Sequence, residues 1–399
     1  MTPGEASGAM SRDPNADAPT LIPYQDYEPP ALPADEKLRH AFRRARRRLL
    51  GTEAETPMVA ADRLGRMGPE RLDQVARGLA HGPALEEIDA TLAPWLRAGE
   101  RARIEVVLVP PCDEEGVVAR WAAARGLATL AAPPRARLLG QDGEPDIAGE
   151  GVLVIPRLEA WALRHREGLG AVRGLLRSLA NGRRRAVVGC GIHAWGWLAA
   201  AAGVATQLPA PRTFRPFDAA RLGAWFDGLL AESHDAAGRV RLSTTGEDVL
   251  ARSEDGGLES DHLRILAARS RGIPWVAWHL WRGGLRDVPH AEGRGADRLP
   301  DGEGDGHALW VAPSPDPTLP PGAERESRHV LHALLVHGPL PPDMLAATLP
   351  IVGATHVLPA LLDAGFVRRD EDGCLACAPA AYPAIRDALA AAGHPLGVA

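Results

Sequence analysis

The sequence predicts an α/β protein in which a parallel sheet lies between helices, followed by a smaller unit at the C-terminal end. Short apolar runs without polar alternation occur at 104–109, 151–156 and 186–191, as expected of strands buried on both faces. Segments with apolar residues three and four apart separate these runs. The 399 residues are 45% hydrophobic, which is enough for one large core or about two to three smaller ones.

The first hundred residues show two patterns. Residues 1–34 are rich in Pro, Ala, Asp and Gly and lack apolar periodicity, which predicts a disordered lead-in. Residues 35–100 are predicted to be a helical N-terminal region, because apolar residues recur three and four apart. The helix at 38–49 carries six arginines on its other face. We interpret them as a solvated face; docking on phosphates or on an acidic partner is the alternative.

Residues 101–216 form the predicted α/β core. The three apolar runs alternate with helical stretches such as 168–180, and a further strand-like segment lies near 127–133. Parallel strands need crossover connections of about a dozen residues or more, which these helices supply. The order therefore predicts a parallel sheet with both faces covered.

Three further parts follow the predicted core. Residues 217–286 have mostly helical spacing and are predicted to form a helical lid. Residues 287–326 are rich in Pro, Gly and Asp around a short apolar island, which predicts a linker with one β-hairpin edge. Residues 327–399 contain three short helical segments, a turn-centred β-pair and a last helix. This is the order of a winged helix-turn-helix.

Three segments resemble those of bacterial P-loop ATPases of the AAA/STAND type that carry a C-terminal winged helix. GVLVIPRLEAWALRHREGLGAVRGLL is similar to their second-strand segment, VVGCGIHAWGWL to their sensor strand, and SRGIPWVAWHLW to their GxP motif, with Gly272 and Pro274 at its two fixed positions. The resemblance runs from about residue 100 to the end and rests on the order of the segments. It implies a P-loop NTPase-like parallel sheet with a phosphate-binding loop directly after the first strand.

The phosphate-binding loop that the resemblance implies is degenerate. An active loop reads Gly-x4-Gly-Lys-Ser/Thr, and its backbone N–H groups and lysine surround the phosphates. The aligned segment starts at Pro111, and only Gly116 matches. Val117 replaces the lysine, and Val118 replaces the hydroxyl that holds Mg²⁺. Three carboxylates, at 113–115, would also repel a triphosphate.

The positions that resemble the magnesium site and the γ-phosphate sensor are degraded as well. Pro156 and Arg157 stand where the resemblance implies Asp and Glu, and Glu159 is a poor substitute two residues further on. Cys190 occupies the sensor-like position. The single lysine of the chain, Lys37, lies in the N-terminal segment. We therefore predict a pseudo-ATPase without a cofactor; an α/β core unrelated to nucleotide binding is the alternative.

Two further patterns have the spacing of metal ligands. Cys374 and Cys377 form a C-x-x-C, but no second pair follows nearby in the sequence. His329 and His332 lie one helical turn apart without a carboxylate between them. We interpret these as packed or surface residues and predict no metal site. The tryptophans that recur at every third residue over 275–281 are predicted to be core residues.

Charge and hydropathy limit the partners. The net charge is −6, and residues 327–399 contain four basic and six acidic residues, so protein contacts are favoured over nucleic acid. We expect a cytoplasmic protein without membrane insertion, because no run of about 18 apolar residues occurs. The sequence predicts a regulatory or scaffolding partner of an active ATPase relative, or a homo-oligomer. A winged-helix transcriptional regulator stays open, as does an atypical ATPase in which Arg120 or Arg157 replaces the lysine.

Overall fold

The computed structural model describes residues 20–32, 64–76, 82–97, 102–140, 143–231, 240–253, 256–287, 309–313, 316–350 and 354–397. The arginine-bearing helix predicted at 38–49 lies outside the described residues, as does most of the predicted linker. Within the described part, no helix is long and apolar enough to cross a bilayer.

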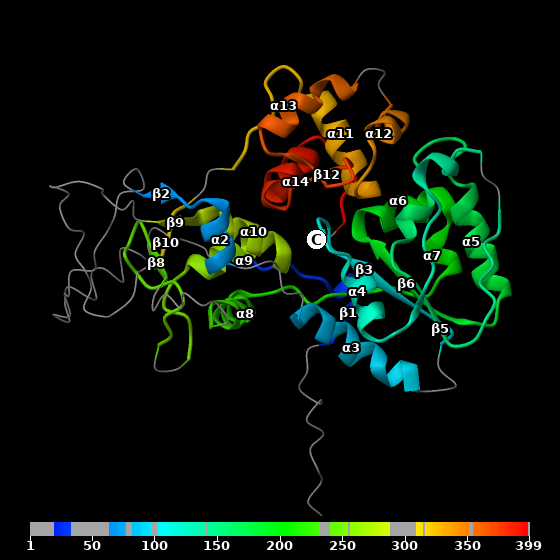
Figure 1. Ribbon diagram of the computed structural model, residues 1–399, viewed down its shortest axis with the longest axis horizontal. Coiled ribbons are helices and arrows are strands. Elements are labelled where there is room, and N and C mark those ends of the chain that lie inside the picture. Colours follow the sequence, from blue (N-terminus) through cyan, green and yellow to red (C-terminus); the bar gives the residue numbers. More distant parts are fainter. Residues whose placement is uncertain are drawn as a thin grey trace, which may run out of the picture.

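A six-stranded sheet forms the centre of the larger part of the structure (Figure 1). Its strands lie side by side in the order β1 (Ile22–Pro23), β7 (Arg212–Thr213), β3 (Ile104–Val109), β6 (Arg185–Gly191), β5 (Val152–Ile155) and β4 (Ala128–Thr129). The strands from β7 to β4 are parallel, and β1 pairs antiparallel with β7. The prediction of an α/β fold with a mostly parallel sheet is therefore confirmed.

Crossover helices connect the parallel strands. They are α4 (Val117–Ala124), α5 (Gly170–Asn181), α6 (Ile192–Ala202) and α7 (Val204–Gln207), and α3 (Gly82–Arg97) precedes the first parallel strand. Helices α3 and α4 pack together, because Asp89 accepts hydrogen bonds from the Trp121 indole and the Arg125 guanidinium. The strands carry almost continuous buried Val, Leu and Ile side chains, as the apolar runs predicted.

Part of the predicted disordered lead-in belongs to the fold. Residues 22–23 form β1, and the 3₁₀ helix η1 (Tyr24–Asp26) follows it. Leu21 and Tyr27 are buried, and the Tyr27 hydroxyl donates a hydrogen bond to the carbonyl of Arg271. The composition of the segment hides this order, because the partners of these two apolar residues are distant in the sequence.

A second, four-stranded sheet takes its strands from the predicted helical N-terminal region, the predicted helical lid and the predicted linker (Figure 1). Its order is β2 (Gly65–Arg66), β9 (Leu285–Asp287), β10 (Leu309–Val311) and β8 (Val240–Leu242). The helices α2 (Pro69–Val75), α8 (Ala219–Ala231), α9 (His262–Arg269) and α10 (Pro274–Gly284) share an apolar core with it. Residues 217–286 are thus not purely helical, and the apolar island of the predicted linker is a core strand. The partners of these short strands are distant in the sequence, so the local pattern does not reveal their pairing.

The C-terminal unit consists of α11 (Glu324–His337), α12 (Pro342–Thr348), α13 (Leu358–Asp363), the antiparallel pair β11 (Val367–Arg369) and β12 (Leu375–Cys377), and α14 (Tyr382–Ala391). Leu340 adds a third, single-residue bridge to β12. The buried side chains of α11 and α14 belong to the same continuous apolar core as those of β3, β5 and β6. The unit is therefore packed on the α/β part rather than tethered beside it (Figure 1).

One glycine of β6 tests this close strand packing. A Cβ at Gly189 would overlap the carbonyl oxygen of Pro156, which is backbone and cannot rotate away, whereas Gly196 in α6 faces open space. We expect Gly189→Ala to lower the free energy of unfolding by about 1–3 kcal/mol. Gly196→Ala should raise it by about 0.5–1 kcal/mol, since alanine favours a helix. Urea unfolding midpoints at an unchanged slope measure both; equal effects would contradict the packing described.

Candidate functional site

The positions predicted for the nucleotide site meet at one edge of the large sheet. Parallel strands end on the same side, so the segments that follow β3, β6 and β5 come together at their carboxyl ends. Because β6 lies between β3 and β5, Cys190 lies between the loop 111–118 and the segment 156–159. In open α/β sheets ligands bind at this edge.

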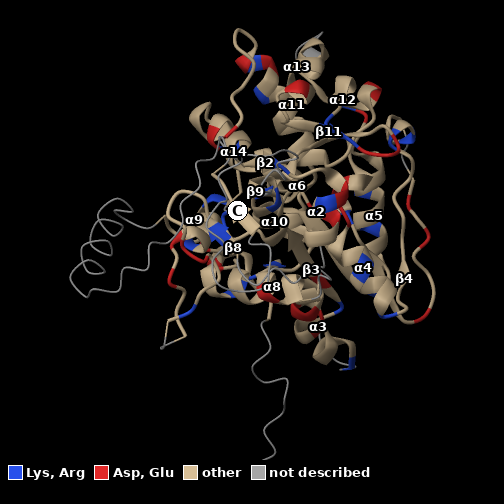
Figure 2. Ribbon diagram, turned by 60° about the vertical axis from the view of Figure 1, so that its left-hand side comes forward, with Lys and Arg blue, Asp and Glu red and all other residues tan. Residues whose placement is uncertain are grey.

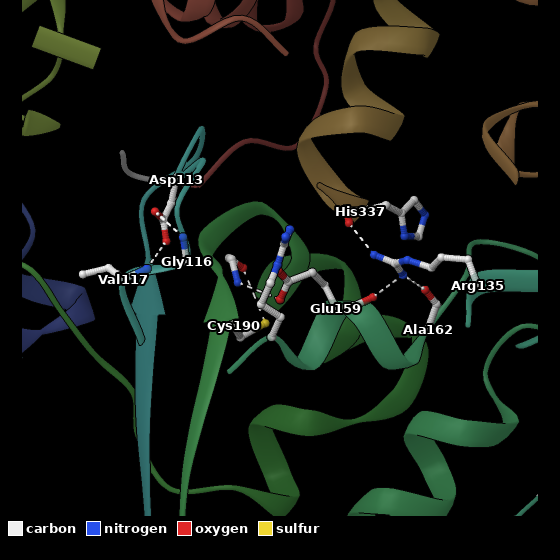
Figure 3. Close-up of polar contacts among 10 residues, drawn as sticks. Asp113, Gly116, Val117, Arg135, Glu159, Ala162, Cys190 and His337 are labelled. Carbon is white, nitrogen blue, oxygen red and sulfur yellow. Dashed lines mark hydrogen bonds and ion pairs between the residues drawn. The ribbon is translucent and has the colours of Figure 1, made fainter. Parts of the chain in front are cut away.

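The Asp113 carboxylate occupies the start of α4. It accepts hydrogen bonds from the backbone N–H groups of Gly116, at 3.0 Å, and Val117, at 2.7 Å (Figure 3). Gly116 has φ +70°, a left-handed conformation that glycine adopts without strain. Backbone N–H groups at a helix start are the groups that bind phosphate in nucleotide sites. Here the protein's own carboxylate takes the place of an anion.

Two hydrophobic residues stand beneath this loop. Val117 is 0% exposed and Val118 is 2% exposed, so both belong to the core. Pro111 also faces the protein, because its carbonyl accepts a hydrogen bond of 2.6 Å from the indole of Trp275. Trp275 follows the GxP-like residues Gly272 and Pro274 at the start of α10. Its hydrogen bond to Pro111 is the contact that connects this segment to the sheet edge.

The other two carboxylates of the loop are also paired. Glu114 contacts Arg368 of β11 at 2.6 Å and His279 of α10 at 3.3 Å. Burial alone would raise the pKa of Glu114, but the hydrogen bond and charge of His279, together with the charge of Arg368, lower it. Glu115 forms an ion pair with Arg120. Arg120 is therefore engaged and does not point a free charge toward a phosphate.

The magnesium-like positions form an internal ion pair. Glu159 lies in the 3₁₀ helix η4 (Leu158–Trp161) and is 5% exposed. One carboxylate oxygen lies 2.9 Å from Nε of Arg157, and the other accepts a hydrogen bond of 3.1 Å from the backbone N–H of Gly191. Glu159, two residues beyond the magnesium-like positions, thus reaches the carboxyl end of β6. Burial, with the neighbouring Glu159, raises the pKa of the Cys190 thiol, so the sensor-like position is a neutral thiol.

Arg135, which the sequence analysis missed, holds the end of α11 at this edge. It starts the 3₁₀ helix η3 (Arg135–Leu138) and donates hydrogen bonds to the carbonyls of His337 at 2.6 Å, Glu159 at 2.8 Å and Ala162 at 3.0 Å (Figure 3). Burial lowers the pKa of Arg135 to about 10, and the nearby charge of Arg157 adds to this. No local pattern marks this residue, because its partner lies 202 positions away.

Arg157 lies against the same helix end. A Cβ at Gly338, the residue that terminates α11 with φ +69°, would overlap the Arg157 guanidinium. The last carbonyls of a helix carry a partial negative charge, which favours cations there. Arg135 and Arg157 therefore both face the C-terminal end of α11. The edge is closed by α11.

The residues weighed as metal ligands do not form such a site. Among the described residues, no group of three or more His, Cys, Asp or Glu side chains could hold a metal ion. Cys374 and Cys377 are free thiols. The tryptophans of α10 are 1–3% exposed, which confirms their prediction as core residues.

Comparisons with known proteins do not assign the chain to a family. No protein-family model matches the chain, and a search of curated proteins finds no match.

The Asp113 cap gives a direct test. Asp113→Ala leaves the N–H groups of Gly116 and Val117 without their acceptor, so we expect the free energy of unfolding to fall by about 1 kcal/mol, within a range of about 0.5–2. Asp113→Asn should lose about half of this, because its single amide oxygen can accept from only one of the two N–H groups and its NH2 group faces the other. Chemical denaturation measures both variants. If alanine were as stable as the wild type, Asp113 would not be the cap.

Arg135 gives the corresponding test for the closed edge. Arg135→Met removes the donors to three carbonyls, and we expect a loss of about 2–4 kcal/mol. The matched control is Arg137→Met, because Arg137 is exposed in the same 3₁₀ helix; its effect should stay within about 0.5 kcal/mol. Thermal or urea unfolding distinguishes the two. Equal effects would show that the carbonyl contacts contribute little.

Proposed function

We propose that this protein is a catalytically inactive P-loop NTPase-like protein of the AAA/STAND type that acts as a regulatory or scaffolding partner through protein–protein contacts. One observation carries the proposal. The groups that would surround a phosphate at the start of α4 are bonded to the protein's own Asp113 carboxylate. The Asp113 carboxylate thus takes the position that a phosphate of the ligand would have.

The sheet order supports the relation to P-loop proteins. With β6 between β3 and β5, the sensor-like residue Cys190 lies beside both the loop 111–118 and the segment 156–159. A group that reads the γ-phosphate needs this position, since phosphate loop and Mg²⁺ ligands must be within its reach. The order of three helices, a β-pair and a last helix in the C-terminal unit likewise supports the winged-helix interpretation.

The chemistry of the edge argues against hydrolysis. Mg²⁺ prefers oxygen ligands and carries two positive charges, yet the one carboxylate at the magnesium-like position, Glu159, is already paired with Arg157. Arg120 and Arg157, the two candidates for a lysine substitute, both have carboxylate partners. ATP would have to break these pairs and displace Asp113 before the phosphates found any partner. Each of these steps reduces affinity.

Protein contacts fit the C-terminal unit better than nucleic acid does. Helix α13, in the place of a recognition helix, carries no basic residue. Arg368, which follows it, pairs with Glu114. Figure 2 shows acidic and basic residues interspersed over the described elements. We therefore propose an active ATPase relative or a second copy of this chain as the partner, without a nucleic-acid ligand.

Nucleotide binding is the first measurement. Calorimetry of the full chain with ATP and with ADP, with and without Mg²⁺, should give no binding up to ~1 mM, because the phosphate-binding N–H groups are occupied. Phosphate release from the same preparation should stay at the level of buffer, with an active P-loop ATPase as the positive control. Micromolar binding would overturn the closed-site argument, and Mg²⁺-dependent phosphate release would overturn the inactive assignment.

The same preparation tests the choice of partner. Light scattering over a wide range of protein concentrations should show a mass that rises above 42.3 kDa if a second copy is the partner. A constant monomer mass would exclude the homo-oligomer and leave the ATPase relative.

A further inference from the structure

Five histidines gather where the C-terminal unit meets the α/β part. We name them the α11 histidine cluster, and they are His193, His329, His332, His337 and His394. Three of them, His329, His332 and His337, lie on α11 itself. His193 belongs to α6 below, and His394 follows α14. The cluster therefore spans the junction between the two parts.

Arg164, in the loop after η4, contacts two of these imidazoles directly. Its backbone N–H donates a hydrogen bond of 3.2 Å to Nε2 of His337. Its guanidinium Nη1 lies 3.2 Å from Nδ1 of His332, and since arginine is a donor only, the imidazole nitrogen must accept. Arg164 also donates to the carbonyl of Thr348 at the end of α12. One loop residue thus holds two helices of the C-terminal unit.

Both contacts require a neutral imidazole. In each case the ring nitrogen that would take up a proton is the one that accepts from Arg164. A protonated imidazole has two donors and no acceptor. Protonation would therefore place one donor against another and turn each hydrogen bond into a repulsion. Near His332 it would also place a positive charge beside a guanidinium.

The other packing contacts of the cluster involve a hydroxyl group and aromatic rings. His193 is 6% exposed, and its Nε2 lies 3.3 Å from the Tyr382 hydroxyl of α14. The His337 ring meets Trp197 of α6 edge-on, with 5.1 Å between ring centres. The ring of His394 lies tilted against His332, with 4.8 Å between ring centres, and edge-on to His329, with 5.7 Å between ring centres. Imidazoles at these distances repel one another once they are charged.

The charged groups around the cluster are nearly all positive. The loops after β4 and β5 contribute Arg135 and Arg164, α11 contributes Arg325, Arg328 and Glu326, and α14 contributes Arg386 and the neutral Tyr382. The single carboxylate in this set, Glu326, faces His329. No described carboxylate acts on His193, His332 or His337 in this set. Backbone hydrogen bonds with Pro395, for His332, and with Ala162, for His337, favour the protonated form, but burial and the neighbouring positive charges outweigh them.

Burial and these charges have the same effect on the three interface histidines. Burial, followed by the charges of His332 and Arg386, lowers the pKa of His193 to about 3. Burial and the charge of Arg164 lower the pKa of His332 to about 4. The pKa of His337 lies well below its usual value for the same reason, with Arg135 adding to Arg164. An exposed imidazole has a pKa of about 6.5.

We propose that this junction is an acid-operated latch, in which protonation of His332, His337 and His193 releases the C-terminal unit from the carboxyl edge of the sheet while the sheet itself stays folded. The latch concerns how the closed edge opens, and it holds whether or not the protein is a pseudo-ATPase.

The sign of the effect follows from proton uptake. The docked histidines have lowered pKa values, so below about pH 6.5 the open form binds more protons than the docked form. Docking is therefore strongest above about pH 6.5 and weakens as the pH falls toward the docked values. Each histidine weakens docking by up to about tenfold per pH unit in this window.

The latch is tested by hydrogen–deuterium exchange of the full chain between about pH 7.5 and about pH 4.5, with each rate corrected for the pH dependence of intrinsic amide exchange. We expect α11, α14 and the loop of Arg164 to lose protection as the pH falls, while β3, β5 and β6 keep theirs. Loss of protection in all segments together would mean acid unfolding of the whole protein and would overturn the proposal. Unchanged protection of α11 at the lowest pH would overturn it as well.

His332→Gln separates titration from packing. The glutamine oxygen can still accept from Arg164 but takes up no proton, so the opening of α11 should lose up to about one proton of pH dependence, or about tenfold per pH unit. The control is His356→Gln, because His356 is exposed on the same unit; its pH dependence should equal that of the wild type. If His332→Gln does not fold, the partly exposed His394→Gln serves, with a smaller shift in the same direction. An unchanged pH dependence in the folded variant would overturn the latch.

Discussion

The C-terminal end of α11 rests on the guanidinium of Arg135, and the closed edge of the sheet depends on this contact. One planar fork donates to the carbonyls of three residues, Glu159, Ala162 and His337, and so ties η4 to α11. A lysine presents a compact ammonium group and would not match this geometry. The cation also complements the partial negative charge of the helix end. The end of α11 is therefore fixed against η4 at the carboxyl edge of the sheet.

The other polar groups of the edge are satisfied in the same manner. Buried Glu159 is paired with Arg157 and with the backbone N–H of Gly191, as a polar group removed from water requires. The less buried Asp113 and Glu114 are also paired within the chain, Asp113 with backbone N–H groups and Glu114 with Arg368 and His279. A ligand would have to replace these partners one after another. Under the proposed function, the interactions that hold the edge closed would also oppose nucleotide binding. Charging the imidazoles beside Arg164 acts on this closure from outside the nucleotide-like positions.

Helix α10 joins the two apolar cores of the molecule. The ring of Trp275 packs edge-on against Phe214 in the larger core, and its indole N–H reaches the loop after β3. Trp278 and Trp281, on the same helix, belong to the smaller core around α8 and the four-stranded sheet. A displacement of the loop after β3 would therefore shift α10 and change the packing of both apolar cores. This shared helix explains why the GxP-like segment lies near the edge without lining it.

The sequence by itself determined the strands β3, β5 and β6, the helices between them and the absence of any lysine besides Lys37, because these depend on local apolar patterns and on residue identity. Tertiary structure alone decided the strand order, the second sheet and the closure of the edge, because each rests on partners distant in the chain, such as Arg135 and His337. Glu159 shows the difference most clearly. The sequence places it two positions beyond the end of the strand, and only the structure shows that the 3₁₀ helix η4 directs its carboxylate to the backbone N–H of Gly191 in β6.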